Sequence, residues 1–384
     1  MAPVRVVVGA VSGSQVASCS LEATALVEEL QQRVAQATGT PPLRQRLLLH
    51  GAELPAGASL AECLVEDGAW VTLVVTAPAV PGDTVLTASS DGLARFWSAR
   101  SGECLRLLEG HDDEVTSAAF SPDGALVVTA SRDGTARCWS AETCQCRWVF
   151  QGHGSAVLAA SFSPDGKEVV TSSEDCVAML WNAETGEYIL TLHGIGAWTS
   201  DEQGHSGPVH SAIFSPDGAL VLTASGDCTA KLWSAETSEH VKTLAGHKGP
   251  VYSAVFSPDA SLVLTASYDS TARVWSRDVS CCAVTLQGHG GPVRSAVFSA
   301  QGHSILTAAD DCTVRLWDAD TGEPLLTLQG HQSRVRSAVF APDGGSLLTA
   351  SDDGTARLWT AETGEHIRTL TGNGGAVCSA VFVP

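Results

Sequence analysis

The segment GHKGPVYSAVFSPDASLVLTASYDSTARVWS, residues 246–276, contains the pattern around which most of this 384-residue chain is organised. Its recurring features are a Gly-His pair, a Ser-Pro-Asp triplet, a Thr-Ala-Ser-x-Asp run and a tryptophan. The tryptophan recurs every 42 residues, with a single step of 52, at Trp97, Trp139, Trp181, Trp233, Trp275, Trp317 and Trp359. An aspartate keeps the same steps at Asp91, Asp133, Asp175, Asp227, Asp269, Asp311 and Asp353. Two residue types in phase over seven copies indicate a repeat architecture.

Each repeat is predicted to form four strands. In the quoted copy and its continuation these are Pro250–Ser257, Ser261–Tyr268, Thr271–Arg277 and Cys281–Gln287, with Ser-Pro-Asp as the first turn. A period near 40 with Gly-His and Trp is the mark of a four-stranded propeller blade. The repeats resemble the WD-repeat family over about four-fifths of the chain. The resemblance implies a mainly β protein with a seven-bladed β-propeller over residues 83–384.

The two ends of the propeller segment are expected to share one blade. Nothing before Trp97 resembles a Gly-His pair with an innermost strand, whereas the chain ends on Gly372-Asn373 and a strand over residues 376–383. We therefore expect this last strand to complete the blade whose other strands come from residues 83–109. Closure by both ends of the chain removes free sheet edges.

The resemblance also implies a polar tetrad of His, Ser or Thr, Asp and Trp in each blade. The complete sets are His111, Ser131, Asp133, Trp139; His153, Ser173, Asp175, Trp181; His205, Ser225, Asp227, Trp233; His247, Ser267, Asp269, Trp275; and His331, Ser351, Asp353, Trp359. A sixth set, His289, Asp311 and Trp317, has Ala309 in place of the serine and is expected to lose a hydroxyl. The shared blade would use Asn373, Ser89, Asp91 and Trp97, with Asn replacing His. A buried carboxylate is tolerated only with its donors, so these residues are expected to stabilise the blades.

The repeated Ser, His and Asp do not indicate a hydrolase. The constellation recurs in every blade beside a tryptophan and has no nucleophile-elbow sequence. An enzyme would need an unrepeated polar cluster, and the sequence shows none. We expect no catalytic activity, no cofactor and no metal site.

Residues 1–82 lack the repeat. Their pattern predicts a strand at Val4–Val8 and a second strand that ends near Leu21. A helix is predicted next, with Thr24 as its cap, Leu26, Val27, Leu30 and Val34 at helical spacing, and Gly39 as its stop. Further strands are predicted at Gln45–Leu49 and Val71–Val75. This is the element order of the α+β ubiquitin β-grasp. The segments TGTPPLRQRLLLHGAELPAGASL, residues 38–60, and WVTLVV, residues 70–75, resemble ubiquitin.

The resemblance implies a ubiquitin-like domain over residues 1–77, followed by a linker at residues 78–82. The segment has no conjugating diglycine tail and no lysine, so it is expected to dock and not to tag other proteins. The docking face of ubiquitin corresponds here to Leu48 and Val74, with Thr72 and Gly51 nearby. The alternative is that the propeller covers these strands.

The net charge of −20 limits the partners. Residues 1–82 hold seven acidic residues and four arginines, which leaves −17 for the remainder. Such an acidic surface repels phosphate, so we expect neither direct nucleic-acid binding nor membrane binding. No apolar run is long enough to span a bilayer, and the N-terminal valines fit a strand better than a signal peptide.

The twelve cysteines do not suggest a disulfide framework. Cys176, Cys228 and Cys312 share one repeat position, where other copies carry Gly or Ser, and equivalent positions in different blades lie too far apart to pair. We expect reduced thiols. Together with the charge, this predicts a cytoplasmic protein, with the nucleus as a second possibility, that works as a monomer within a larger complex.

The loops at the Gly-His and Asp-turn end are expected, by resemblance, to hold the partner contacts. Two variable positions should line that face, one after the first valine of each inner strand and one before the repeated aspartate. Their residues are Thr116, Leu158, His210, Tyr252, Arg294, Arg336, Cys378, and Ser90, Arg132, Glu174, Gly226, Tyr268, Asp310, Asp352. Tyr252, Tyr268, Arg294, Arg334 and Arg336 fall on three consecutive blades and are residue types enriched at interface hot spots. The alternative is that variable positions simply collect surface residues.

The single 52-residue step inserts ten residues near HGIGAWTSDEQ, residues 193–203. Loops that depart from a repeat often bind partners, and Trp198 lies in this one. It is expected either to anchor a partner or to pack on a neighbouring blade.

These observations predict a non-catalytic scaffold whose propeller face binds a protein or peptide while the ubiquitin-like domain docks a second factor. One version is an adaptor in ubiquitin or proteasome handling. A second resembles the Notchless group of ribosome-assembly factors, which also join a ubiquitin-like N-terminus to a propeller. A third is a regulatory subunit of an enzyme or signalling complex.

Overall fold

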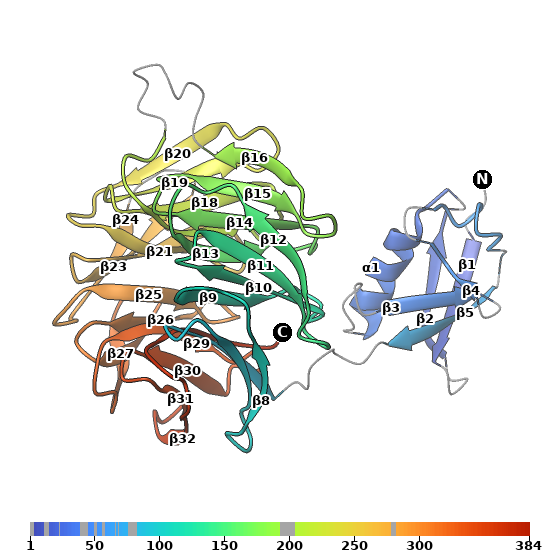
Figure 1. The fold of residues 1–384 in the computed structure, drawn as a ribbon. Helices are drawn as coiled ribbons and strands as arrows, with labels where there is room; N and C mark the ends of the chain where they lie inside the picture. Colours follow the sequence, from blue (N-terminus) through green and yellow to red (C-terminus); the bar gives the residue numbers. More distant parts are fainter. Residues whose placement is uncertain are drawn as a thin grey trace. The chain divides into compact units, whose positions relative to one another are not determined.

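The chain forms two compact units, Met1–Ala79 and Val80–Pro384 (Figure 1). The computed structural model describes residues 4–10, 15–22, 24–38, 45–49, 52–55, 58–65, 67, 69–75, 83–192, 204–277 and 282–384.

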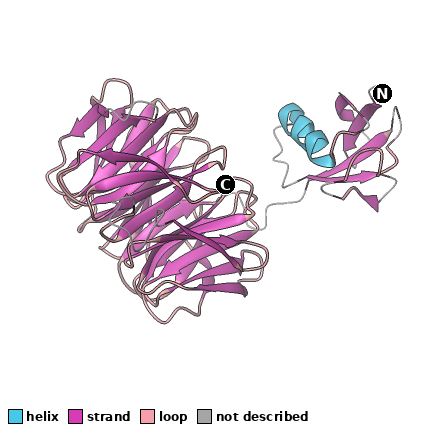
Figure 2. Ribbon diagram, turned by 90° about the horizontal axis from the view of Figure 1, so that it is seen from above, coloured by secondary structure: helices cyan, strands magenta, loops and turns pink. Residues whose placement is uncertain are grey.

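The first unit is a sheet with one helix among its described residues (Figure 2). Its elements are β1 (Val4–Ala10), β2 (Gln15–Leu21), α1 (Val27–Thr38), β3 (Gln45–Leu49), β4 (Ala52–Glu53) and β5 (Trp70–Val75). The strand order is β2-β1-β5-β3-β4, and the pairing of β1 with β5 is parallel while the other pairs are antiparallel. This arrangement confirms the predicted α+β ubiquitin-like fold.

The core of this unit follows from two hydrophobic periods. Val6 and Val8 alternate inward on β1, and Val27, Leu30 and Val34 form the buried side of α1. The helix begins at Val27 rather than after Thr24, so the predicted cap is wrong. The chain before it is fixed by backbone contacts instead, because Val27 N–H donates to the Ala58 carbonyl at 3.0 Å.

The second unit consists of seven four-stranded antiparallel sheets, which confirms the predicted mainly β propeller (Figures 1 and 2). Blade 1 contains β33 (Val377–Phe382), β6 (Thr84–Ser89), β7 (Ala94–Ser98) and β8 (Cys104–Leu108). Blade 2 contains β9 (Val115–Phe120), β10 (Leu126–Ser131), β11 (Thr135–Ser140) and β12 (Cys146–Gln151). Blade 3 contains β13 (Val157–Phe162), β14 (Glu168–Ser173), β15 (Ala178–Asn182) and β16 (Tyr188–Leu192). Blade 4 contains β17 (Val209–Phe214), β18 (Leu220–Ser225), β19 (Thr229–Ser234) and β20 (His240–Ala245).

The remaining three blades repeat the same order. Blade 5 contains β21 (Val251–Phe256), β22 (Leu262–Ser267), β23 (Thr271–Ser276) and β24 (Cys282–Gln287). Blade 6 contains β25 (Val293–Phe298), β26 (Ser304–Ala309), β27 (Thr313–Asp318) and β28 (Pro324–Gln329). Blade 7 contains β29 (Val335–Phe340), β30 (Ser346–Ser351), β31 (Ala356–Thr360) and β32 (His366–Leu370).

The sequence of each strand matches its depth in the blade. Second strands such as β22, LVLTAS, are buried along nearly their whole length and are apolar on both faces. Fourth strands such as β12, CRWVFQ, are mostly exposed. The core lies between blades, because Val128 and Phe150 of blade 2 pack against Val157 and Trp181 of blade 3. Each blade therefore depends on its neighbours for burial.

Blade 1 joins the two ends of the propeller unit. β33 pairs with β6 from Val377–Ser89 to Phe382–Val85. The Ser337 hydroxyl of blade 7 accepts the Ala380 N–H at 3.2 Å, and Ser379 accepts the Ala118 N–H of blade 2 at 3.2 Å. First strands of neighbouring blades contact one another around the whole ring, including β29 with β33 and β33 with β9. The ring is thus continuous through blade 1.

Candidate interaction site on the propeller

Each of blades 2–7 contains a buried polar clamp. In blade 5, Trp275 Nε1–H donates to Thr265 Oγ1 at 2.8 Å, Thr265 Oγ1 lies 2.7 Å from His247 Nε2, and His247 Nδ1 lies 2.8 Å from Asp269 Oδ2. The threonine hydroxyl receives the indole proton and has one proton to give, so Nε2 accepts it and Nδ1–H donates to the carboxylate. The clamp consumes the hydrogen-bonding capacity of its histidine and leaves no free base for catalysis.

The clamp fixes the charge states of its members. Burial lowers the pKa of His247 despite the opposing effect of Asp269, so the imidazole is neutral at pH 7. Burial alone would raise the pKa of Asp269, but hydrogen bonds from Thr271, the Lys248 backbone and His247 lower it to about 2. The neutral His247 beside the ionised Asp269 is a structural pair, and the same His–Asp contact recurs in blades 2–7.

The predicted tetrad hydroxyl is assigned to the wrong residue. The sequence points to the serine at the end of each second strand, whereas the structure uses the threonine two residues earlier. The replaced serines are Ser131, Ser173, Ser225, Ser267 and Ser351, and the threonines in the clamps are Thr129, Thr171, Thr223, Thr265, Thr307 and Thr349. Residues two apart share a strand face, so the pattern alone does not distinguish them.

The serine has a different role at the turn. A register shift between Ala130 and Ser131 moves Ser131 out of the regular ladder. Its hydroxyl donates to the Asp113 carbonyl at 3.2 Å and accepts the Asp133 N–H at 3.1 Å. Ser131 therefore ties the turn to the incoming loop.

The expectation that Ala309 leaves its clamp without a hydroxyl is also wrong. In blade 6, Thr307 accepts from Trp317 Nε1 at 2.8 Å and lies 2.8 Å from His289 Nε2. Asp311 lies 2.9 Å from His289 Nδ1. What blade 6 lacks is the serine at the turn, and its clamp is complete.

Blade 1 carries a different clamp. Thr87 accepts from Trp97 Nε1 at 2.8 Å and donates to Asn373 Oδ1 at 3.1 Å. Asn373 does not bond to Asp91, and Ser89 Oγ has no hydrogen-bond partner. Asp91 is instead held by Arg95 Nη1 and Nη2 at 3.0 and 2.5 Å and by the Gly374 N–H at 2.8 Å. An arginine on the third strand thus replaces the missing histidine.

One end of the ring brings the candidate partner-binding residues together, and we call this end the mouth. In blade 5, β21 begins, β22 ends, β23 begins and β24 ends at this side. The mouth is therefore made of the loops that enter each first strand and the turns between second and third strands. Both variable positions predicted to line the partner face lie there.

An aromatic and arginine cluster spans blades 4–6 of the mouth. The Arg294 guanidinium lies 4.3 Å from the centre of the Tyr252 ring, within cation–π range. Tyr252 also contacts His210, with ring centroids 5.1 Å apart, and Tyr268 at 6.5 Å. Tyr268 is 55% exposed and forms the accessible part of the cluster.

Arg294 is neutralised within its own blade. Its Nε and Nη2 both donate to the Asp310 carboxylate at 2.7 Å. These hydrogen bonds raise the pKa of Arg294 against the effect of burial. The pair holds the guanidinium in place over Tyr252, so Arg294 is an orienting group as well as a surface cation.

Blade 7 repeats this pairing. Arg336 Nε donates to Asp352 Oδ1 at 2.5 Å, and Arg336 is half-buried. Arg334 is exposed, and its side chain has no ion-pair or hydrogen-bond partner in the part of the chain that the structure describes. Of the two blade 7 candidates, Arg334 is the one available to a ligand.

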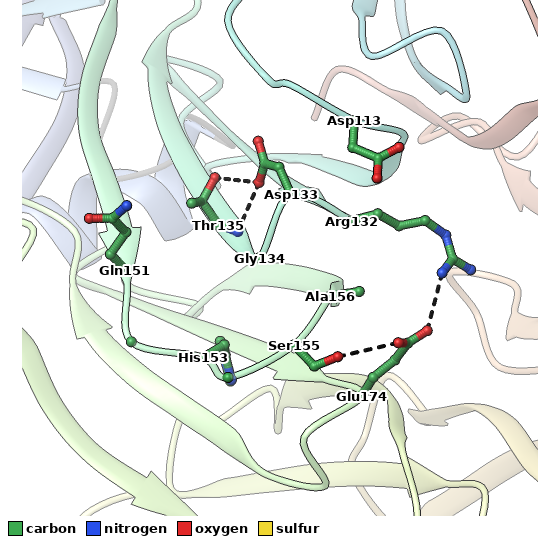
Figure 3. Close-up of a pocket in the computed structure, with 12 residues that line it drawn as sticks. Asp113, Arg132, Asp133, Gly134, Thr135, Gln151, His153, Ser155, Ala156 and Glu174 are labelled. Carbon is green, nitrogen blue, oxygen red and sulfur yellow. Dashed lines mark hydrogen bonds and ion pairs between the residues drawn. The ribbon is translucent and has the colours of Figure 1, made fainter.

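An open cavity of about 650 Å³ lies at the mouth between blades 2 and 3 (Figure 3). Arg132 crosses it, with Nε 3.0 Å from Glu114 Oε2 and Nη1 3.2 Å from Glu174 Oε1. Ser155 Oγ donates to the other oxygen of Glu174 at 3.4 Å. Figure 3 shows Arg132 and Ser155 both directed at Glu174. The lining is polar, so the cavity suits hydrogen-bonding groups of a partner rather than an apolar ligand.

The remaining predicted contacts lie elsewhere. Leu48 is half-buried on β3 and pairs with Thr72 of β5, while Val74 pairs with Arg46. The Val74 side chain, Gly51 and Trp198 lie outside the described residues. The structure therefore places the five propeller candidates, Tyr252, Tyr268, Arg294, Arg334 and Arg336, at one end of the ring. It does not test whether Leu48, Val74 and Trp198 act with them.

Several contacts between side chains at the mouth were not predicted. Asp310 and Asp352 orient the two arginines, Glu114 and Glu174 hold Arg132, and His210 supports Tyr252. A signal for the first pair was present, because Arg294–Asp310 and Arg336–Asp352 share the same spacing of 16 residues. The Arg132–Glu174 and His210–Tyr252 contacts cross between blades, and spacing within one repeat carries no information about them.

The described residues contain no group of three or more His, Cys, Asp or Glu that could hold a metal ion. No helix among them is both long and apolar enough to cross a membrane.

A model of the WD domain, G-beta repeat, matches six segments: residues 102–140, 144–182, 198–234, 238–276, 280–318 and 322–360. These cover more than half of the sequence. The chain belongs to the WD40 family. Residues 6–78 match the ubiquitin family. No repeat match includes Trp97 of blade 1, the blade that is assembled from both ends of the unit of this WD40 protein and carries Asn373 in place of histidine.

The curated relatives match only short stretches. Nuclear distribution protein PAC1 of Mycosarcoma maydis is 49% identical over 43 residues, which is 11% of this chain and 10% of PAC1. Transcription initiation factor TFIID subunit 5 of Arabidopsis thaliana is 53% identical over 38 residues, 10% of this chain and 6% of the relative. Human WD repeat-containing protein 86 is 35% identical over 71 residues, 18% of each chain. The matched stretch thus covers less than a fifth of the length of each of these relatives, which is one or two repeats.

A WD40 propeller joined to a ubiquitin-like domain is the architecture of a protein-interaction scaffold. WD40 domains generally bind proteins and are typically non-catalytic, and no catalytic family matches the chain.

Proposed function

We propose that this protein is a non-catalytic adaptor that binds a protein or peptide at the mouth of the propeller and a second factor through the ubiquitin-like domain. The single observation that carries the proposal is the Tyr252–Tyr268–Arg294 cluster. It presents an exposed aromatic side chain, held by fixed neighbours, on an otherwise acidic body. Pre-organised Tyr and Arg side chains lose little conformational entropy on binding, which favours hot-spot behaviour.

The neighbouring geometry supports this role. Arg294 is fixed by two hydrogen bonds to Asp310, so the ring of Tyr252 stays in place without a ligand. The polar cavity between blades 2 and 3 offers hydrogen-bonding groups on the same end of the ring. Protein interfaces combine such anchors with a polar rim.

On the ubiquitin-like domain, we propose the open side of β3 and β5 as the docking face. Leu48 and Thr72 lie opposite each other there, and Trp70, two residues before Thr72, is 44% exposed. We propose that this domain couples the propeller's partner to ubiquitin or proteasome handling. We place this activity in the cytoplasm, because each cysteine of the described residues is free, as expected in a reducing compartment.

The test is affinity capture with the full-length chain and two variants. Tyr252→Ala with Tyr268→Ala alters the mouth, and Tyr188→Ala removes an equally exposed tyrosine, 54% against 55%, from the outer strand β16. We expect the mouth variant to lose at least one specific partner that the Tyr188→Ala variant and wild type retain. Equal partner profiles for all three proteins would refute binding at the mouth.

Leu48→Ala tests the second half of the proposal. It is expected to remove a different set of proteins, enriched in ubiquitin-pathway components, without affecting the partner of the mouth. Loss of pre-ribosomal proteins instead would favour the ribosome-assembly alternative.

A further inference from the structure

The charges at the mouth are unevenly distributed around the ring. Blades 2 and 3 contribute Asp112, Asp113, Glu114 and Glu174 against Arg132 and the partly buried Arg137. Asp112 and Asp113 are exposed, and neither carboxylate has an ion-pair partner among the described residues. The aspartates of the clamps, Asp133 and Asp175, are each enclosed by their own hydrogen-bond donors. This sector of the mouth has a net negative charge.

The opposite sector, formed by blades 5–7, is cationic. Its two Arg–Asp pairs, Arg294–Asp310 and Arg336–Asp352, cancel. Lys248 in the loop entering β21 and Arg334 in the loop entering β29 remain, and both are exposed. Neither side chain has an ion pair or hydrogen bond within the described ranges. Between them, the loop entering β25 carries Gly290 and Gly291 and adds no acidic side chain.

Between these sectors, blade 4 has no exposed charged side chain at the mouth among its described residues, and its Lys231 is buried and donates to the Gly204 carbonyl. Gly226 has no side chain, and an added Cβ there would lie 3.6 Å from His210 Nε2. Both His210 ring nitrogens lack a hydrogen-bond partner in the described part of the chain. Burial and the nearby Arg294 lower the pKa of His210 to about 4, so the ring is neutral at pH 7 and offers one donor and one acceptor.

The other end of the ring has a different character. Its turns carry Asp123, Asp165, Asp217, Asp259 and Asp343 in the Ser/Ala-Pro-Asp sequences, and Glu142, Glu184, Glu236 and Glu362 in the turns to the fourth strands. The propeller segment as a whole carries −17. The sector of Lys248 and Arg334 is therefore a place where an acidic segment gains an attraction that the rest of the body opposes.

We propose that the mouth binds an extended polypeptide segment with ordered charge, placing acidic residues over blades 5–7 and basic residues over blades 2 and 3. This deepens the proposed function and depends on it. Blade 4 and the neighbouring aromatic side chains Tyr252 and Tyr268 contact the middle of the segment. The two charged sectors fix its direction, since a reversed segment would place like charges together.

The experiment selects ligands from a displayed library of random 12-residue peptides with the full-length protein as bait. A fully extended 12-residue peptide reaches about 40 Å. We expect enriched peptides to separate an acidic block from a basic block in one order along the chain. Enriched peptides without charge order would overturn the proposal.

Two charge-reversed baits locate the sectors. Lys248→Glu with Arg334→Glu is expected to abolish selection of the acidic block and to weaken binding of the best wild-type peptide about tenfold. Its control is Lys167→Glu with Arg100→Glu, which makes the same charge change at the opposite end of the ring, where both residues are exposed. Asp112→Lys with Asp113→Lys is expected to abolish selection of the basic block, with Glu184→Lys and Glu362→Lys as its control. Equal effects of a pair and its control would overturn the proposal, since net charge alone would then explain binding.

The same library separates this inference from the proposed function. Peptides that depend on Tyr268 yet lack charge order would overturn the ordered-charge proposal and leave the adaptor proposal standing. Peptides retained equally by wild type and by Tyr252→Ala with Tyr268→Ala would contradict binding at the mouth itself. Matching thermal melts of all baits show that losses do not arise from unfolding.

Discussion

Replacing Arg95 by methionine should weaken the propeller more than the same change in any blade with a complete clamp. Arg95 donates twice to Asp91, and the two side chains are only 9% and 17% exposed. Removing one partner of a buried pair leaves an uncompensated charge and costs about 3 kcal/mol. Blade 3 carries Met179 on the equivalent strand position, so methionine fits there.

The matched control is Arg137→Met in blade 2. Asp133 is already held by His111 at 2.7 Å and by Thr135, and Arg137 makes no ion pair with it. This change removes the partly buried Arg137 side chain beside Gly110 and should cost about 1 kcal/mol or less. For a unit of this size, unfolding entropy near 2 cal/mol/K per residue converts these costs to Tm losses of about 5 °C and below 2 °C.

Differential scanning calorimetry of the full chain measures both variants. Hydrogen bonds and charge from Arg95 lower the pKa of Asp91 although burial alone would raise it. A lowered folded-state pKa gives stability that is present above the unfolded value near 3.9 and is lost as the pH falls through the folded value. The Tm difference between wild type and Arg95→Met should thus be complete at pH 7 and should shrink below about pH 4.

Asn373→His provides the rescue. In the Arg95→Met background it supplies a ring nitrogen to Asp91, as His289 does to Asp311 at 2.9 Å, and should recover at least half of the lost Tm. Equal melting of Arg95→Met and Arg137→Met would refute the role given to Arg95.

The remaining predictions concern the turns, the clamps, histidine titration and ring closure. Cys176→Gly, Cys228→Gly and Cys312→Gly should each stabilise the fold by about 1 kcal/mol in urea titrations, because these residues adopt φ of +72°, +71° and +66°, whereas Gly134→Cys, at +83°, should destabilise it. Thr265→Val should cost about 3 kcal/mol by leaving Trp275 and His247 without their partner, and Ser267→Ala about 1 kcal/mol; a larger effect at Ser267 would restore serine as the clamp residue. The pKa of His210 is lowered in the folded state, so protonation of this ring destabilises the fold as the pH falls below the unfolded value near 6.5, and this destabilisation levels off near pH 4. His210→Gln should flatten the loss of Tm in this window, and an unchanged profile would contradict the burial of His210 in a neutral form. Deleting residues 372–384 removes β33 and should abolish cooperative unfolding, while an unchanged melt would refute closure through blade 1.

The repeat made the architecture predictable. Seven aspartates and seven tryptophans in phase define the blades, and the departures at both ends predict their shared sheet. The mouth positions followed from the same period, because residues at one place in the repeat lie at one end of every blade. The contacts they make did not follow, since Arg132 to Glu174 joins different blades.

The errors at the clamps have a simple physical origin. Thr129 and Ser131 are both small, hydroxylated and on one strand face. Trp139 pairs with Val127, so Thr129 is two positions away from that pair and within reach of the indole, whereas Ser131 is four positions away. The role of Arg95 could not be predicted either, because most blades carry arginine at this position of the third strand. This arginine forms close hydrogen bonds to the turn aspartate in blade 1, where Asn373 replaces the histidine. Substitutions that compensate each other through space leave little trace in a single sequence.

Site-specific photocrosslinking tests the central claim, that partners bind at the mouth, most directly. A photoreactive phenylalanine derivative replaces Tyr268 at the mouth in one full-length protein and Tyr188 on the outer strand β16 in another; the two tyrosines are 55% and 54% exposed. We predict a discrete crosslinked protein from position 268 that is absent from position 188 and is lost with Lys248→Glu and Arg334→Glu. Crosslinks from position 188 alone, or the same products from both positions, would contradict the account.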